Sequence, residues 1–348
     1  MWSTDDYDFI NAKVHGMRSR LYEDARLAAL LNCSNLTDLL QSLYPGRRRA
    51  FMDDVSVEKF LTEQYFDALT HIRHYMSGRS SVMVETILLR RTVENCKVVI
   101  QFWHQQKQGE PLPGEIGGYL VEDPNIATPA VKPMLDAEAM PDLVAKLPLQ
   151  GLLPDLPDQM KAVFERYEKD HIPFYIFAAL DRAYHDLLWE SVQALRRGDR
   201  RVAVRVIGAE LDAANILAAL RLRFTYGLPM EETLPLLSAH GHLLNAESLE
   251  LMCQAEGADG LIHRLPAEYK AIFVRAHGDL RESERLFWDH LYRMANRIFY
   301  QNMFNIGAIL GFYVFKKIEF MNLARVIQGF RYELPASDIR RELIPLGH

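Results

Sequence analysis

Hydrophobic side chains recur along most of this chain at intervals of three or four residues, the spacing of one face of an α-helix. The pattern predicts helices over residues 8–32, 58–76, 80–106, 157–169, 173–196, 200–226, 283–300 and 306–332, with a last short one after Pro335. Sustained alternation of apolar and polar residues, which indicates β-strands, is absent from the sequence. The chain is therefore predicted to be all-α.

An asparagine marks the same place in three of these helices. Asn95, Asn215 and Asn322 are each followed by an apolar or small residue at the next position, two more at four and five positions on, and a polar residue at six. Offsets of zero, one, four and five share one helix face, so each segment predicts the same buried helix. A Leu-Pro pair follows each asparagine 12 to 18 residues later. Proline is tolerated where a new helix begins, because its missing N–H has no partner there.

This repetition predicts three similar helical subdomains. The asparagines are 120 and 107 residues apart, a period longer than that of solenoid repeats. Nine of the 16 prolines lie between residues 109 and 157, which indicates a connecting segment. We expect a first helical repeat over residues 1–110, a proline-rich connection over 111–156, a second repeat over 157–256 and a third over 257–348.

Charge and cysteine content narrow the classes of function. The 348 residues include 40 Lys plus Arg and 46 Asp plus Glu, a net charge of −6. The chain therefore lacks the basic surface of a general nucleic-acid-binding protein, and a protein partner is expected instead. Cys33, Cys96 and Cys253 are scattered among helical segments, which favours reduced thiols in the cytoplasm over a disulfide framework.

No membrane-spanning or export segment is predicted. The start of the chain is acidic and has no apolar run of the signal-peptide kind. The most apolar stretch, residues 304–315, is shorter than the roughly 20 residues that a spanning helix needs. We expect a buried helix there.

Motifs of catalysis are missing from the sequence. It contains no glycine-rich phosphate-binding loop and no Gly-x-Ser-x-Gly elbow. His71 with His74, and His240 with His242, have spacings that suit a metal ion, but no carboxylate or cysteine set accompanies them in sequence. We therefore expect no catalytic residue, no cofactor and no metal site.

Polar residues three positions before each asparagine leave two interpretations open. Asp212 and Glu319 stand there, with Thr92 as a weaker equivalent. Because the pattern occurs at corresponding places in presumed duplicates, we expect a structural role, in which these side chains satisfy backbone groups or a neighbouring helix. The alternative is an all-α enzyme that uses Glu94, Asp212 or Glu319 as acid–base groups in clefts between the repeats; such groups would have shifted pKa values. A free-standing helical scaffold is the third possibility.

Several segments resemble the central-stalk adaptor of V/A-type rotary ATPases, which is named C in archaeal and bacterial complexes and d in eukaryotes. The similarity covers nearly the whole chain. It includes the opening helix, the three helices around the asparagines, Leu180-Asp181-Arg182-Ala183-Tyr184, and the Gly-Leu-Pro turn at residues 227–229. In the opening helix the similar residues are Ala12-Lys13-Val14 and Gly16-Met17-Arg18-Ser19-Arg20-Leu21.

The resemblance implies a fold and a function. The expected fold is a funnel or wedge of three similar helical subdomains around a pseudo-threefold axis, on the cytoplasmic face of the membrane-embedded proteolipid ring. Its expected role is that of a non-catalytic rotor component, peripheral to the membrane, which couples the central-stalk subunits to that ring for ATP-linked proton or sodium transport. In this interpretation Asn95, Asp212, Asn215, Glu319 and Asn322 are structural residues that define the repeats.

Overall fold

A computed structural model shows helices and connecting segments throughout the part of the chain that it describes, which is residues 5–45, 54–124, 131–149, 153, 156–301 and 305–345. No strand occurs among these residues, so the all-α prediction is confirmed. No helix of this part is both long and apolar enough to span a membrane.

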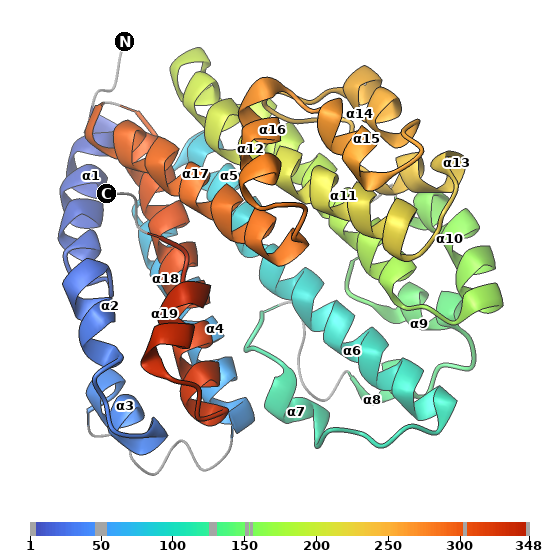
Figure 1. The fold of residues 1–348 in the computed structure, drawn as a ribbon, viewed down its shortest axis with the longest axis horizontal. Helices are drawn as coiled ribbons and strands as arrows, with labels where there is room; N and C mark the ends of the chain where they lie inside the picture. The colour runs from blue at the N-terminus through green and yellow to red at the C-terminus, as the bar shows by residue number, and fades with distance from the viewer. Residues whose placement is uncertain are drawn as a thin grey trace.

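The first third of the chain runs from the left edge of the molecule through its middle in Figure 1. Its helices are α1 (Asp5–Arg18), α2 (Asp24–Leu30), α3 (Leu36–Leu43), α4 (Asp54–Arg73), α5 (Gly78–Leu88) and α6 (Arg90–Gln108). Short helices follow in the proline-rich segment: α7 (Ile116–Tyr119), α8 (Lys132–Leu135) and α9 (Met140–Lys146). Figure 1 shows α1, α2 and α3 along one edge, whereas α6 leads away from that edge toward α7 and α8.

The middle of the chain contains two long helices that pack together, and shorter elements after them. These elements are α10 (Leu156–Asp170), α11 (Phe174–Gln193), α12 (Arg197–Leu220), a π-type turn over Arg221–Thr225, α13 (Met230–Thr233), a 3-10 turn over Leu234–Leu236, and α14 (Ala246–Cys253). Both α5 and α6 pack against α11, so the first and middle parts of the chain share an interface.

The last part returns to the first. Its helices are α15 (Ala258–His263), α16 (Ala267–Arg275), α17 (Leu280–Gln301), α18 (Gly307–Arg331) and α19 (Ala336–Glu342). α17 packs on α18 and α12, and α18 also packs on α1 and α4. The two ends of the described chain therefore meet along α18, as the blue and red ribbons of Figure 1 show.

The three asparagines lie in long helices that resemble one another at their ends. Asn95 lies in α6, Asn215 in α12 and Asn322 in α18. Shortly after each helix the backbone takes a left-handed conformation, at Gly109, Gly227 and Glu333. Such a residue lets the chain turn away while the last helical carbonyl groups remain hydrogen-bonded.

The prolines after these helices behave differently from one another. Pro229 and Pro335 immediately precede α13 and α19, as the sequence predicts. Pro113 does not, because α7 begins only at Ile116. Gly114 follows that proline with φ 156°, outside helical geometry, so the chain is still turning there.

Two predicted helices are each divided in the structure. The helix predicted over 80–106 is interrupted at Leu89, between α5 and α6. The spacing over residues 8–32 indicated a single helix, but α1 ends at Arg18 and α2 begins at Asp24. Between them Leu21 is buried, and the backbone N–H of Tyr22 donates to Glu319 at 2.8 Å. A tertiary hydrogen bond has replaced the helical one, which the spacing of apolar residues does not reveal.

A continuous apolar core joins all three parts of the chain. Its buried side chains run from Ile10 in α1 to Ile344 after α19. A second, smaller cluster lies between α2, α3, α19, the start of α4 and the C-terminal half of α18. The segment 304–315, where it is described, lies in the larger core at the start of α18.

Candidate functional site

The side chain of each repeated asparagine holds the backbone of a later segment. In each case the amide group accepts a hydrogen bond from a backbone N–H and donates one to the carbonyl of the same residue. These pairs join Asn95 to Val121, Asn215 to Ser238 and Asn322 to Ile344, at 2.8–3.2 Å. The partners follow the asparagines by 26, 23 and 22 residues. All three asparagines are buried, so the same contact occurs three times at similar separations.

Asp212 binds the backbone a few residues after Ser238, the residue that Asn215 binds. Its carboxylate accepts the backbone N–H groups of His242, Leu243 and Leu244 at 2.7–3.2 Å and the hydroxyl of Tyr269 at 2.6 Å. Burial raises the pKa of Asp212 to about 6, although these four donors act in the opposite direction.

Access to Asp212 is closed. Its side chain is fully buried, and a Cβ added to Gly241 would lie 1.8 Å from its Oδ1. A general acid or base must reach a substrate atom, and Asp212 cannot do so without displacing this segment. All four hydrogen bonds of Asp212 are therefore with groups of this chain.

Glu319 and Glu94 face separate surroundings. Glu319 is buried and accepts the Tyr22 N–H at the turn between α1 and α2, with Lys316 as its ion-pair partner. Glu94 is half exposed and pairs with Arg90 and Lys97. The described structure therefore assigns these two carboxylates and Asp212 to three different sets of contacts.

The histidine pairs do not form a metal site in the described structure. The His240 ring stacks on Trp189 with a centroid separation of 5.5 Å, and His74 Nδ1 lies 2.7 Å from the carbonyl oxygen of Thr70. Among residues 5–45, 54–124, 131–149, 153, 156–301 and 305–345, no three His, Cys, Asp or Glu side chains are placed to hold a metal ion.

A cluster of charged side chains joins the three asparagine helices. Arg90 in α6, Glu210 in α12 and Lys317 in α18 each stand five residues before the asparagine of their helix. Lys317 pairs directly with Glu210, and Arg90 is close enough to Glu210 to interact with its charge. The three side chains are 31%, 17% and 26% exposed, respectively. We call them the charge triad.

Ion pairs between α6 and α11 form one part of the cluster. Asp181 accepts from Arg90 at 2.8 Å and from Lys97 at 2.5 Å. Burial disfavours the charged carboxylate, but the two cations outweigh this effect and hold the pKa of Asp181 at about 2. Asp181 is therefore ionised at neutral pH, together with its partners.

An ion pair and hydrogen bonds between α12 and α18 form the other part of the cluster. Both carboxylate oxygens of Glu210 accept from the Tyr313 hydroxyl, at 2.8 and 3.0 Å. Burial disfavours ionisation of Glu210, but Lys317 and Tyr313 together keep its pKa below the usual value. Tyr313 is buried, as are Tyr65 and Tyr184, which belong to the same electrostatic network. These three phenol groups lie where the charge triad meets the apolar core.

His185, one turn after Asp181 on α11, makes the cluster sensitive to acid. Burial lowers the pKa of His185 to about 4, more than the attraction of Asp181 raises it. In the unfolded chain a histidine titrates near 6.5. Between these two values the unfolded state binds a proton that the folded state does not, so stability is lost as pH falls from about 6.5 to about 4.

We expect His185→Gln to reduce this loss. Between pH 7 and pH 5 the free energy of unfolding of the unmodified chain should fall by about 1–2 kcal/mol more than that of the variant, a value discounted for partial exposure of the ring. Urea titrations at several pH values measure the difference. His263→Gln, at an exposed position on α15, controls for the loss of an imidazole, and an equal effect of both substitutions would contradict the prediction.

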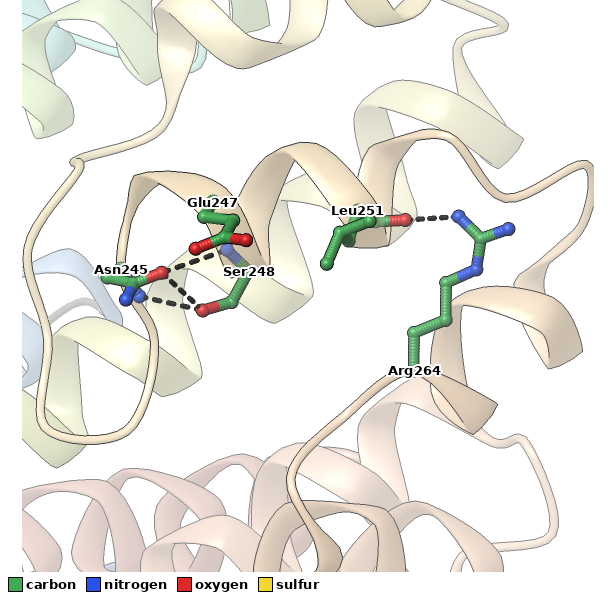
Figure 2. Close-up of a pocket in the computed structure, with 5 residues that line it drawn as sticks. All are labelled: Asn245, Glu247, Ser248, Leu251 and Arg264. Carbon is green, nitrogen blue, oxygen red and sulfur yellow. Dashed lines mark hydrogen bonds between the residues drawn. The ribbon is translucent and has the colours of Figure 1, made fainter.

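A surface hollow lies away from this cluster, beside α14 (Figure 2). It is lined by Asn245, Glu247, Ser248, Leu251 and Arg264. Asn245 and Ser248 cap the start of α14 through reciprocal hydrogen bonds, and Arg264 donates to the carbonyl of Leu251. These polar groups hydrogen-bond to one another. They cap α14 and connect it to the end of α15.

The charge triad was not predicted from the sequence, although a signal for it exists. The apolar positions that define the repeat lie after each asparagine. A charged residue stands five positions before each asparagine, but its sign differs: it is positive in α6, negative in α12 and positive in α18. Asp181 and Tyr184 belong to the Leu-Asp-Arg-Ala-Tyr segment that was part of the resemblance.

Comparison with known proteins identifies one family and several relatives. Residues 10–342 match the ATP synthase (C/AC39) subunit family. The chain is 22% identical to the C subunit of the A-type ATP synthase of Methanothermobacter thermautotrophicus, over 93% of this chain and 84% of that protein. It is 22% identical to the corresponding protein of Methanosphaera stadtmanae, over 97% and 88%, and 21% identical to that of Methanocaldococcus jannaschii, over 98% and 86%.

These similarities extend over nearly the full length of the chain and confirm the resemblance seen in the sequence. The matched range contains α6, α12 and α18 in full. The chain belongs to the ATP synthase (C/AC39) subunit family.

Proposed function

We propose that this protein is a non-catalytic rotor component of a V/A-type ATPase. In this role it couples the central-stalk subunits to the membrane proteolipid ring, on the cytoplasmic face, for ATP-linked proton or sodium transport. Family membership supports the assignment to a rotary ATPase. The more specific assignment to the junction of stalk and ring is what the resemblance to the rotary-ATPase adaptor implies, and the repeated contacts of the three asparagine helices support it.

The repeated asparagine contact is the observation that carries the proposal. The same two hydrogen bonds at similar separations support three related units over 1–110, 157–256 and 257–348, joined by 111–156. The contact between Lys317 and Glu210 and the charge interaction of Arg90 with Glu210 support a pseudo-threefold axis near these corresponding positions. A threefold module suits an adaptor that surrounds the end of a shaft and rests on a ring.

The partly exposed charges of the cluster supply a protein-binding surface. Arg90, Asp181 and Glu94 are 31%, 32% and 46% exposed. Charged groups arranged in this way favour recognition of one partner over another and add less to raw affinity. Asp212, Asn215 and Asn322, in contrast, are buried and so would not contact the partner.

Co-purification tests the proposal directly. The tagged full-length chain is expressed in its native cells, captured from membranes in mild detergent, and its bound proteins are identified by mass spectrometry. We expect the central-stalk and proteolipid subunits. Recovery of the chain alone, as a stable monomer, would overturn the proposal and favour a scaffold or an enzyme.

A charge reversal tests the binding surface. Glu94→Lys should reduce recovery of the stalk subunits by about tenfold, because it places a third cation beside Arg90 and Lys97. The matched control is Asp142→Lys on α9: Asp142 is 45% exposed, against 46% for Glu94, and it also pairs with a lysine on its own helix. Equal recovery with both variants, at unchanged thermal stability, would remove this cluster from the interface.

A further inference from the structure

A row of arginines lies on the surface of α12 over its first turns. Arg197, Arg201 and Arg205 are spaced by four residues and therefore lie one above another on one helix face. Arg196 and Arg200 flank them, and all five residues are exposed. We call these five residues the arginine row. The chain has a net charge of −6, so the row is a local concentration of positive charge on an acidic protein.

The charges of the arginine row, unlike those of the charge triad, are not paired within the described part of the chain. None of the five forms an ion pair with a carboxylate there, and Arg200 donates instead to the backbone carbonyl of Gln193. Asp199 is the one acidic residue among positions 196–205. It is buried, and its carboxylate accepts from the Tyr7 hydroxyl and the Ile306 N–H. The row is therefore available to an external anion.

These arginines destabilise the helix on which they lie. The start of a helix carries a partial positive charge, so cations in its first turn are unfavourable, and like charges four residues apart repel each other. Arg196 also occupies the N-cap position, where in the described structure no side chain caps the first N–H groups of α12. A bound anion reverses these effects, because it neutralises the arginines and can accept from the uncapped N–H groups. This arrangement therefore suits an anionic ligand.

The length of the row favours an array of anionic groups over a single one. Arg197 and Arg205 are separated by about 12 Å along the helix axis, farther than one phosphate group reaches. Positions 196–205 contain five arginines and no lysine, and arginine binds phosphate oxygens through pairs of N–H groups. The row therefore fits a surface on which phosphate groups recur.

Exposed aromatic side chains lie at the same end of the molecule. The hydrogen bond from Tyr7 to Asp199 joins the first turns of α1 and α12. Phe9, two residues after Tyr7, is 61% exposed, and its ring centroid lies 5.3 Å from that of Tyr75, which is 43% exposed. Aromatic rings near a basic helix face are typical of proteins that rest on the headgroup region of a bilayer.

We propose that the arginine row binds the anionic phospholipid headgroups of a membrane surface. The inference goes beyond the proposed function, in which the chain reaches the membrane through protein partners. A bilayer contacts one end of the molecule and leaves the acidic remainder in water, whereas a polynucleotide that extended past the row would be repelled by the net negative charge. Phe9 and Tyr75 add apolar contact at headgroup level.

Vesicle sedimentation tests the proposal with the purified full-length chain. Vesicles of phosphatidylcholine with about one-third phosphatidylglycerol should bind the chain, whereas vesicles of phosphatidylcholine alone should not. Binding should weaken as the ionic strength rises from about 0.05 M to about 0.5 M. The triple variant Arg197→Gln, Arg201→Gln and Arg205→Gln should lower the partition coefficient by at least about tenfold.

The matched control removes the same amount of charge elsewhere. Arg275→Gln, Arg281→Gln and Arg340→Gln change exposed positions on α16, α17 and α19, and this variant should keep the partition coefficient within about twofold. Because the arginine row opposes its own helix, its triple variant should unfold at the same temperature as the unmodified chain or at a higher one. Thermal unfolding therefore separates loss of binding from loss of folding.

Three outcomes would overturn the proposal. The chain could fail to bind the anionic vesicles, bind both kinds of vesicle equally, or lose binding equally in the two triple variants, which would make total charge the cause. Capture of an acidic protein segment by the row, without binding to vesicles, belongs to the first outcome. Failure of vesicle binding leaves the proposed function in place, because co-purification of the stalk and proteolipid subunits tests that function separately.

Discussion

Replacing Asn215 by alanine should lower the free energy of unfolding by about 3 kcal/mol. The substitution removes two hydrogen bonds to the backbone of Ser238. Ser238 is buried, so its N–H and carbonyl groups would lose their partner without access to water. Each buried polar group left without a partner costs about 1–3 kcal/mol, so the two together account for the expected loss.

The three asparagines should not be equivalent in this respect. Ile344, the partner of Asn322, is buried like Ser238, so Asn322→Ala should cost about as much as Asn215→Ala. Val121, the partner of Asn95, is partly exposed, and water can replace some of the lost contact. We therefore expect Asn95→Ala to cost about half as much, about 1–2 kcal/mol.

Urea denaturation of the full-length chain measures this order. Asn35→Ala is the matched control, because Asn35 caps α3 at an exposed site by accepting the backbone N–H of Asp38. Loss of such a cap costs about 1 kcal/mol. Equal losses for all four substitutions, or the largest loss at Asn95, would show that burial of the held peptide group does not determine the effect.

The helices were predictable where one face is consistently apolar. The middle and C-terminal long helices match their predicted ranges within a few residues, because α11, α17 and α18 bury side chains every three or four positions. That Asn215 has a hydrogen-bond partner was also predictable from sequence, since a polar residue on a buried helix face must find one. Its partner, Ser238, was not, because nothing in the local sequence specifies which distant backbone group will face the side chain.

Features that depend on contacts between distant segments escaped prediction. The turn between α1 and α2 follows from the hydrogen bond to Glu319, almost 300 residues away in the chain. The charge triad follows from the convergence of three helices, whereas each of its members alone resembles an ordinary surface charge. The ion pairs of Asp181 likewise depend on Arg90 and Lys97, which lie on another helix. The local sequence pattern therefore predicts the helices, whereas the partners of their polar side chains depend on tertiary packing.

Gly208→Ala should be at least as damaging as Asn215→Ala, with an expected loss of about 3–4 kcal/mol. A Cβ at residue 208 would lie 2.7 Å from the backbone nitrogen of His242 and 3.0 Å from the carbonyl carbon of Gly241. Backbone atoms cannot swing aside as a flexible side chain can, so α12 and this segment must separate. Overpacking costs about 1–3 kcal/mol, and separation also weakens the hydrogen bonds that Asp212 accepts there.

The same helix offers the control. Gly198, in the first turn of α12, has no atom within 4 Å of an added Cβ. Alanine is a better helix former than glycine, so Gly198→Ala should raise the free energy of unfolding by about 0.5 kcal/mol. Urea denaturation compares the two variants, and a stabilising effect of both would show that α12 and the segment at Gly241 are farther apart than the structure places them.

Gly208, Asp212 and Asn215 should act together, because they lie four and three residues apart on one face of α12 and all contact the segment from Ser238 to Leu244. Once Gly208→Ala has displaced that segment, the hydrogen bonds of Asn215 to Ser238 are already weakened. The double variant Gly208→Ala with Asn215→Ala should therefore lose at least about 1 kcal/mol less than the sum of the single losses. Strict additivity in the same urea titrations would mean that the two residues stabilise independent parts of the fold.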